Sequence, residues 1–295
     1  YMAGWLAEER PDLSFPQANG EDSDIRVAHC PERVMPGHVV RELVENDRVI
    51  GGMTARCAAE AAELYRIFVE GDCINTSVRT AEMAKLTENS FRDVNIAFAN
   101  ELSVVCDKLD INVWELLRLA NRHPRVNILQ PGPGVGGHCI AVDPWFIVSE
   151  TPEEARLIRT AREVNDRKPE WVIEKVQQAV GQFLAANPKH TARDVTIACF
   201  GLAFKPDIDD LRESPALRVA EMILERAAGK MQIVEPNITK LPEGELEGAE
   251  LVDLPTALEH ADILVMLVDH KSFKDAPQDA VAARLTVDCR GVWDG

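Results

Sequence analysis

The spacing of apolar residues changes along the chain and predicts a different set of elements in each part. Residues 26–30 and 48–51 are short apolar runs typical of strands. Thr54 then precedes a run with helical spacing over 55–70, where its side chain can cap the helix. From Thr80 to Leu109 apolar residues keep a helical period, which predicts one long amphipathic helix. Shorter helices are expected over 113–121, 153–165 and 169–186.

Continuous apolar strands alternate with helices in the last third of the chain. The strands are expected over 195–200, 231–235, 263–268 and 285–288, with helices from Ser214-Pro215 and over 255–260. This alternation is typical of a parallel, doubly wound sheet. The fold class is therefore α/β. We predict a βαβ-like part over residues 1–76, with too little material to close a sheet, a helical part over 77–188 and an α/β domain over 189–295.

Composition and charge narrow the possible functions. The 295 residues are enough for about two hydrophobic cores. The net charge of −17 argues against nucleic-acid binding but leaves room for a small anionic ligand. No apolar run is long enough to cross a membrane, and no signal peptide is recognisable. The seven cysteines are scattered without a C-x-x-C pair, so neither a metal site nor a disulfide framework is indicated, and a cytoplasmic protein is expected.

A glycine-rich stretch followed by a cysteine is the strongest candidate for chemistry. Four of the six residues over 132–137 are glycine, namely Gly132, Gly134, Gly136 and Gly137. Glycine allows close approach of the backbone to a ligand, and Cys139 at the rim can serve as a nucleophile. Asp143 is near enough in sequence to orient a water or a cation. The alternative is a connecting loop with an inert, buried cysteine.

The same glycines also match the dinucleotide pattern G-x-G-x-x-G. That pattern requires a strand before it and a helix that opens at its last glycine. Residues 127–131 are short and end in proline, and Pro144 is expected to interrupt any helix that starts here. We therefore reject a nucleotide-binding turn at this position.

Two further groups of polar residues lie where ligands could bind. Lys205 and Arg212 belong to a loop between a strand end and a helix N-terminus, a favourable place for an anion. The aspartates of this loop could instead form a solvated face or pair with those cations. Lys85 and Asn89 are four residues apart and share one face of the long helix, although a solvated lysine is the ordinary alternative. The apolar surface of that helix suggests either a subunit interface or an ordinary core helix.

Four motifs occur together in a fixed order, and together they resemble the nucleotide-sugar 6-dehydrogenases, the UDP-glucose/UDP-N-acetylmannosamine dehydrogenase family. The motifs are Glu32, Lys85-Leu-Thr-Glu-Asn89, the Gly132–Cys139–Asp143 loop, and Phe204-Lys-Pro followed by Leu211-Arg-Glu-Ser214. The segment Pro31-Glu-Arg-Val-Met-Pro-Gly37 is similar to the N-acetylhexosamine branch. The resemblance implies NAD-dependent, four-electron oxidation of UDP-N-acetyl-D-mannosamine to its uronate for surface polysaccharide synthesis of the enterobacterial common antigen type. It also implies a homodimer formed through the helix over 80–109.

The resemblance further implies a role for each candidate residue. Cys139 would bind the aldehyde as a thiohemiacetal that is oxidised to a thioester. Lys85 and Asn89 would stabilise the oxyanion, while Asp143 and Glu32 would activate water for hydrolysis. Arg125, the four loop glycines and Lys205 would contact the sugar nucleotide, Arg125 from its own or a neighbouring subunit, and Arg212 would contact NAD.

The chain departs from the family pattern near its beginning. The NAD fingerprint and the family's catalytic threonine stretch are absent, and residues 1–76 resemble only the last part of the family's NAD domain. The sequence leaves open whether the chain is a fragment or a degenerate homologue. We expect the 295 residues to bind UDP-sugars without reducing NAD⁺. A non-catalytic UDP-sugar-binding or dimerisation module remains the alternative, as does a dehydrogenase for another UDP-hexose such as UDP-glucose.

Overall fold

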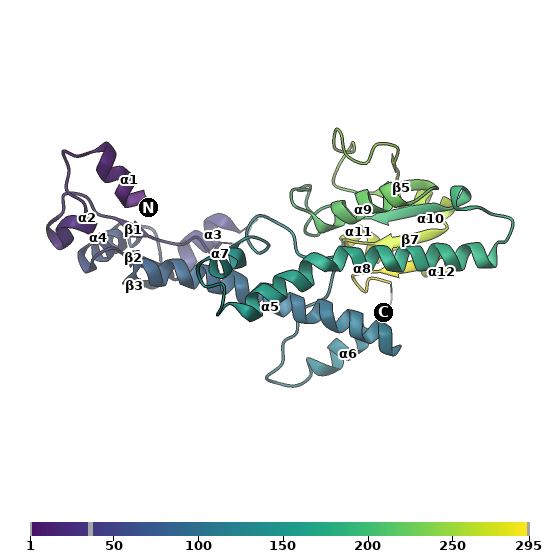
Figure 1. Ribbon diagram of the computed structural model, residues 1–295, viewed down its shortest axis with the longest axis horizontal. Helices are drawn as coiled ribbons and strands as arrows, with labels where there is room; N and C mark the ends of the chain where they lie inside the picture. The colour runs from purple at the N-terminus through teal and green to yellow at the C-terminus, as the bar shows by residue number, and fades with distance from the viewer. Residues whose placement is uncertain (1, 35–37, 294–295) are drawn as a thin grey trace. The chain divides into compact units, whose positions relative to one another are not determined.

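The computed structural model describes residues 2–34 and 38–293 and consists of two compact units (Figure 1). The first unit comprises Tyr1–Asn89 and the second Ser90–Gly295. Helix α5, Val78–Leu109, contributes residues to both units. It was predicted from Thr80 and begins two residues earlier. Each unit has a sheet and a hydrophobic core of its own.

A small three-stranded sheet forms the first unit. Its strands are β1 (Ala28–His29), β2 (Arg48–Gly52) and β3 (Cys73–Ser77). Strand β2 pairs antiparallel with β1 and parallel with β3, and helix α4 (Ala55–Tyr65) connects β2 to β3. Thr54 caps α4 as predicted, but the helix ends at Tyr65 rather than at residue 70. The sequence analysis overlooked β3 because polar residues interrupt its apolar pattern.

Short helices complete the first unit. They are α1 (Met2–Glu9), α2 (Pro16–Asn19), the 3-10 turn Gly20–Asp22 and α3 (Val39–Glu45). The core is limited, since Ile50, Ala58 and Ala62 are its fully buried apolar residues, packed against Tyr65 and two cysteines. Such a small core contributes little hydrophobic stabilisation compared with that of the second unit.

Helices α5, α6 (Val113–Ala120), α7 (Asp143–Glu150) and α8 (Arg156–Ala186) precede the second sheet. The two helices expected over 153–165 and 169–186 are one continuous helix, α8, with Pro169 inside it. A proline removes one backbone hydrogen bond and costs about 3 kcal/mol in an isolated helix. Arg162, Asn165, Val172 and Ile173 are buried on both sides of Pro169, so tertiary packing keeps the helix intact.

The second sheet contains five parallel strands in the order β6-β5-β4-β7-β8, as Figure 1 shows in part. The strands are β4 (Thr196–Phe200), β5 (Lys230–Val234), β6 (Glu250–Leu251), β7 (Ile263–Met266) and β8 (Leu285–Asp288). The predicted parallel, doubly wound sheet is therefore confirmed. Helices α9 (Pro215–Arg226) and α10 (Leu254–His260) were expected, whereas β6, α11 (Lys271–Lys274), α12 (Gln278–Ala282) and the 3-10 turn Ala192–Asp194 were not.

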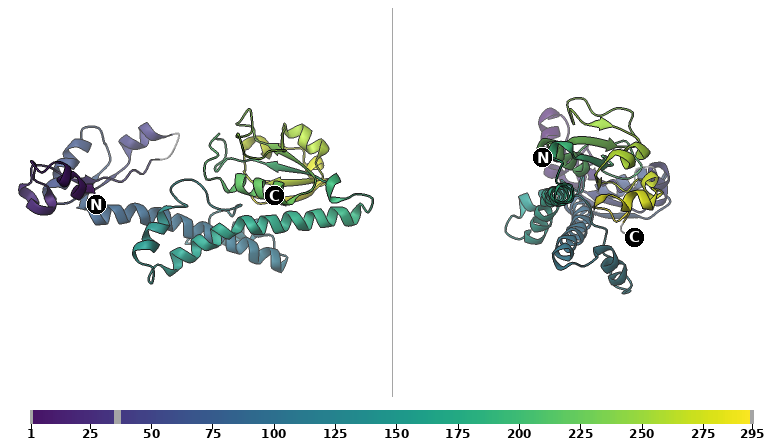
Figure 2. Two further views of the ribbon diagram at one scale, coloured as in Figure 1. Left: turned by 45° about the horizontal axis from the view of Figure 1, so that its top comes forward. Right: turned by 90° about the vertical axis from the view of Figure 1, so that its right-hand side faces the viewer.

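Alternate residues of each strand face opposite layers, which explains the continuous apolar runs. Ile197 and Cys199 belong to the core shared with α8 and α9, while Ala198 and Phe200 belong to the core shared with α10 and α12. Figure 2 shows α8 running along one face of the sheet. The strand order reverses between β4 and β7. In such sheets ligands bind outside the carboxyl ends of the strands at this point.

Candidate active site

Cys139 lies exposed on a turn directly before helix α7. Its carbonyl oxygen accepts hydrogen bonds from the backbone N–H groups of Val142 at 3.0 Å and Asp143 at 2.8 Å. The thiol is therefore accessible, and the alternative of a buried, inert cysteine is wrong. Helix α7 begins at Asp143, which contradicts the expectation that Pro144 would interrupt a helix here. Proline is tolerated in the first turn because its missing N–H would have no intrahelical partner.

The glycine loop over 132–137 packs closely against the loop that precedes α9. The N–H of Gly137 donates to the carbonyl of Glu213 at 3.3 Å. A Cβ atom at Gly136 would lie 2.3 Å from that carbonyl oxygen, and one at Gly137 would lie 3.5 Å from the ring of Phe204. Gly137 also has a φ of +81°, which favours glycine. The structure thus brings the Cys139 loop and the Phe204–Arg212 loop together.

Arg290 supports the glycine loop through contacts of its guanidinium, and this role was not predicted from the sequence. Its Nη1 donates to the carbonyl of Pro131 at 3.3 Å, and its Nε donates to Asp269 at 2.8 Å. A Cβ atom at Gly132 would lie 2.7 Å from that same Nη1. Arg290 is 158 residues away from Gly132 in the sequence, so no local pattern could have linked the two.

A buried polar network anchors the start of the glycine loop. The N–H of Gly132 donates to the side chain of Asn100 at 2.9 Å, and Asn100 donates to Asn165 at 2.9 Å. Asn165 and Arg162 in turn donate to Asp93 at 2.8 Å and 2.7 Å. The network connects α5 with α8 and fixes the backbone that leads to Cys139. Its members are too far apart in sequence to be recognised as a motif.

The loop over 201–212 follows β4 at the point where the strand order reverses. Lys205 is exposed there, and Ser214 caps α9 by accepting hydrogen bonds from Ala216 and Leu217. Arg212 bonds Asp210 through Nε at 2.9 Å and Nη2 at 2.6 Å. These bonds lower the pKa of Asp210 to about 2. The expected alternative, that an aspartate of this loop pairs with a cation, therefore applies to Asp210.

A small cavity opens between these loops at the carboxyl ends of β4 and β7. It has a volume of about 50 Å³ and is lined by Gly134, Phe204, Pro206, Asp269 and Arg290, among others. A second hollow of about 450 Å³ adjoins it and is lined by Gly134, Val142, Trp145, Arg212 and Arg218, among others. Arginine side chains line both, but so do acidic ones, among them Glu213 and Glu221 in the larger hollow and Asp269 in the smaller cavity.

Glu32 lies in the first unit and is held by a buried arginine. Its Oε1 accepts hydrogen bonds from Arg48 at 3.0 Å and from the N–H groups of Arg33 and Val34 at 2.7 Å and 3.1 Å. The Arg33 guanidinium pairs with Glu88 at 2.9 Å. Burial alone raises the pKa of Glu32, but the bonds from Arg48 and the backbone outweigh it, and the net pKa is lowered.

Lys85 and Asn89 lie four residues apart on α5, both half-buried, in the same unit as Glu32. The bond from Arg33 to Glu88 ties the Glu32 segment to this stretch of α5. Arg125 is exposed in the turn after α6, with its N–H bonded to His123 at 3.3 Å. Residues 35–37 of the Pro31–Gly37 motif lie outside the described residues.

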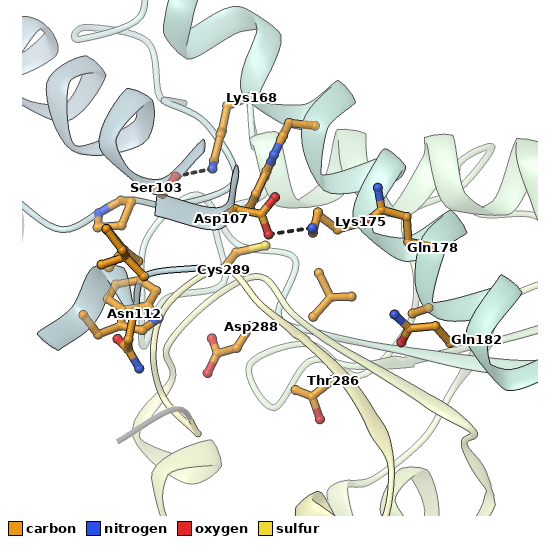
Figure 3. Close-up of a pocket in the computed structure, with 17 residues that line it drawn as sticks. Ser103, Asp107, Asn112, Lys168, Lys175, Gln178, Gln182, Thr286, Asp288 and Cys289 are labelled. Atoms are coloured by element: carbon orange, nitrogen blue, oxygen red, sulfur yellow. Dashed lines mark hydrogen bonds and ion pairs between the residues drawn. The ribbon is translucent and has the colours of Figure 1, made fainter. Parts of the chain in front are cut away.

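A separate cavity of about 380 Å³ lies between α5, α6, α8 and β8 (Figure 3). Lys168 donates to Ser103 at 2.5 Å and lies 3.5 Å above the ring of Trp171. Its burial lowers its pKa to about 8. Lys175 pairs with Asp107 at 2.6 Å. Both lysines are thus already engaged, and Cys139 does not line this cavity.

Among the described residues there is neither a cluster that could hold a metal ion nor a helix that could span a membrane. Over residues 2–34 and 38–293, no group of three or more His, Cys, Asp or Glu side chains is arranged to hold a metal ion. Within the same described ranges, none of the helices is long and apolar enough to span a membrane.

The fold and the site define a class of protein. A doubly wound parallel sheet with a hollow at its switch point is typical of nucleotide-binding folds, and the exposed thiol of Cys139 is suited to covalent chemistry. Sequence models of the UDP-glucose/GDP-mannose dehydrogenase family match three segments of the chain. They are the NAD binding domain over 4–69, the central domain over 79–167 and the UDP binding domain over 198–295. The chain belongs to this family.

Individual relatives agree with this assignment. A UDP-N-acetyl-D-mannosamine dehydrogenase of Yersinia pestis is 65% identical over 292 residues, which cover 99% of this chain and 69% of the relative. An NDP-N-acetyl-D-galactosaminuronic acid dehydrogenase of Ralstonia solanacearum is 61% identical over 99% of this chain and 67% of its own length. The solved UDP-D-ManNAc dehydrogenase of Pyrococcus horikoshii is 36% identical with a TM-score of 0.82, over 99% of this chain and 65% of that one. The chain thus spans about two thirds of the length of these relatives.

Proposed function

We propose that the protein catalyses the NAD-dependent oxidation of UDP-N-acetyl-D-mannosamine to UDP-N-acetyl-D-mannosaminuronate. The observation that carries this proposal is the placement of the exposed Cys139 on a loop packed against Phe204, at the end of the nucleotide-binding sheet. The identity of 65% to the Yersinia pestis enzyme supports the choice of substrate. We place this reaction in the cytoplasm, in the synthesis of a surface polysaccharide, which is compatible with seven free cysteines.

Substrate binding is assigned to the second unit. The glycines at 132, 134, 136 and 137 let the backbone approach the sugar nucleotide, while Lys205 and Arg290 supply positive charge for its diphosphate. Arg125 is exposed and adds a further cation from the same subunit or from a partner. We divide the chain accordingly into a cofactor part over 1–76, a central part over 77–188 and a UDP-sugar part over 189–295.

The reaction converts a primary alcohol into a carboxylate in two oxidations. The alcohol first loses a hydride and a proton to give an aldehyde. The Cys139 sulfur then adds to the aldehyde carbon, forming a thiohemiacetal whose oxygen is stabilised by Lys85 and Asn89. Loss of a second hydride and a proton gives a thioester. Water, activated by Asp143 or Glu32, cleaves the C–S bond and releases the acid and the free thiol.

The described residues fit a dinucleotide cofactor in part. The β2–α4–β3 unit has the parallel crossover found in dinucleotide-binding folds, and the Arg212 guanidinium is 77% exposed and able to meet a phosphate. NAD⁺ would supply the oxidant when bound, and two molecules of it, bound in turn, would each accept one hydride. The bond from Arg48 lowers the pKa of Glu32, which leaves its carboxylate free of a proton at neutral pH but makes it a weaker base.

The proposal is tested by assaying product and NADH with Cys139→Ser. Uronate formation should fall below detection, because an alkoxide is a poor substitute for a thiolate in addition and its ester hydrolyses slowly. Cys73→Ser, which changes a half-buried cysteine of β3, is the matched control and should retain activity. Uronate production by Cys139→Ser at the native rate would rule out the covalent route. The assay uses a preparation in which an N-terminal segment with the family's NAD fingerprint precedes the 295 residues, and UDP-sugar binding without NADH production by that preparation would favour a non-catalytic module.

A second candidate is oxidation of the galacto isomer, which differs from the manno sugar at both C2 and C4. The relative from Ralstonia solanacearum is almost as similar to this chain, at 61% identity. Comparing kcat/KM for UDP-N-acetylmannosamine and UDP-N-acetylgalactosamine decides between them, since the ratio reports differential transition-state binding. A ratio below one would assign the protein to the galacto substrate, and turnover of UDP-glucose alone would reject both.

We also propose a homodimer formed through α5. Phe91, Phe98 and Val105 are seven residues apart on one stripe of this helix and are 70%, 51% and 44% exposed. Large apolar side chains in such a stripe are typical of a helix–helix interface. Phe98→Asp should yield a monomer by light scattering at micromolar concentration, whereas Arg92→Glu, an exposed position on a different face of the same helix, should leave the dimer intact. A monomeric native chain would contradict the proposal.

A further inference from the structure

We infer that the buried pair Glu235–His270 positions the Lys205 turn for nucleotide binding; this inference rests on the proposed function. Both side chains are fully buried, although an acid and a histidine would ordinarily be solvated. Glu235 directly follows β5, and His270 lies in the segment after β7, so both lie at the edge of the sheet where ligands bind. Neither residue contacts Cys139 or belongs to a sequence motif.

The pair reaches the turn through a chain of hydrogen bonds. The N–H of Asp207 donates to Nδ1 of His270 at 2.9 Å. Because Nδ1 accepts, the proton of the ring lies on Nε2, which donates to Glu235 Oε2 at 3.0 Å. The same carboxylate oxygen accepts from the N–H groups of Leu202 and Ala203 at 2.7 Å and 3.2 Å. The pair therefore holds both ends of the segment that presents Lys205.

The backbone of the turn is held in a conformation that requires such support. Asp207 has a φ of +60°, which is unfavourable for residues with a Cβ atom, although aspartate tolerates it better than most. Its Oδ1 accepts from the N–H of Lys271 at 3.0 Å, directly after His270. Burial raises the pKa of Glu235, but the bonds from His270, Leu202 and Asn237 outweigh it and the net pKa is lowered. The carboxylate thus stays charged and fully bonded.

The test measures the affinity of the 295-residue chain for uridine 5′-diphosphate by calorimetry, with thermal unfolding in parallel. His270→Phe keeps the ring contact with Phe273 but removes the hydrogen bonds of the imidazole with Asp207, Glu235 and Asn237, and should weaken UDP binding at least about tenfold. His270→Gln retains a donor and an acceptor and should restore most of the affinity. Met222→Ala, a core change on α9, lowers stability without touching the turn and should bind UDP normally.

A second pair of variants keeps the test informative if His270→Phe does not fold. Asp207→Ala and Asp207→Gly both remove the exposed carboxylate, but only glycine adopts a φ of +60° without strain. The glycine variant should bind UDP several-fold more tightly than the alanine variant. Equal affinities there, native affinity in His270→Phe, or an equal loss in Met222→Ala would each overturn the inference. A native chain that does not bind UDP would instead overturn the proposed function, and the inference with it.

Discussion

At the scale of single residues, the position and the pKa of charged side chains in this protein depend on partners that lie far away in sequence. Glu32 was identified from its motif, but Arg48, which determines its charge state, was not. Arg48 is 3% exposed, and besides Glu32 it bonds the carbonyl of Leu43 at 2.9 Å. The fold therefore fixes the position of Arg48, and this buried cation holds the exposed carboxylate of Glu32 in place.

Arg48→Met should change the pH dependence of turnover in a preparation that oxidises UDP-N-acetylmannosamine. The folded-state pKa of Glu32 is lowered, so its carboxylate stays ionised, and the associated stability persists, until the pH falls through that lowered value. Removing Arg48 raises the pKa, and the acidic limb of the kcat profile should move to higher pH.

Arg41→Met is the control, because Arg41 pairs with Glu45 at 2.7 Å and is 72% exposed. The profile of this variant should match that of the native protein. An unchanged acidic limb in a folded Arg48→Met variant, judged by circular dichroism, would show that Glu32 is not the base in the rate-limiting step.

At the scale of elements, α5 and α8 are joined by two ion pairs that differ in burial. Asp93 and Arg162 are 0% and 2% exposed, whereas Asp107 and Lys175 are 36% and 25% exposed. The buried pair belongs to the network that ends at Gly132, so it connects the packing of these helices to the loop that carries Cys139. The exposed pair lies at the rim of the cavity in Figure 3.

Asp93→Asn should destabilise the protein by about 1–3 kcal/mol, because it removes the buried carboxylate that accepts from Arg162 and leaves the half-exposed Asp166 to pair with that guanidinium. Asp107→Asn is the matched change on the same helix and should cost less than about 1 kcal/mol, since water screens that pair. Urea unfolding of both variants gives the two values. Similar losses for the two aspartates would mean that the α5–α8 contact does not depend on the buried pair.

At the scale of the whole molecule, the two units have separate cores of very different size. The sheet of the second unit is covered on both faces, while the core of the first consists of a few residues around Ile50. Units of this kind need not unfold together. Nucleotide binding is assigned to the larger one.

Differential scanning calorimetry should accordingly resolve two unfolding transitions. UDP at 100 times its Kd should stabilise the larger unit by about 2.7 kcal/mol, which corresponds to a rise of roughly 5–10 °C in its Tm. The smaller transition should not move, and Lys205→Ala should reduce the rise at the same UDP concentration. Equal displacement of both transitions by UDP would contradict the assignment of the ligand to the second unit.

The α/β class of fold could be predicted from the sequence alone, and the sequence also provided the candidate positions for chemistry. Burial on both faces makes the strands β4 and β7 nearly continuous apolar runs, and the caps at Thr54 and Ser214 are local hydrogen bonds that short-range patterns encode. Glycine density and the following thiol likewise identified the Cys139 loop without reference to the rest of the chain.

Only the tertiary structure decided which residues support these positions. Three contacts join segments that no periodic pattern in the sequence links. They are those of Arg290 with the glycine loop, of Arg48 with Glu32 and of Glu235 with His270. The continuity of α8 through Pro169 also depends on burial against other elements, and so does the start of α7 at Asp143. A local pattern reports the hydrogen bonds and the spacing of nearby residues. Desolvation and charge pairing instead depend on which distant residues the fold places next to a side chain. These partners could therefore not be predicted from the sequence.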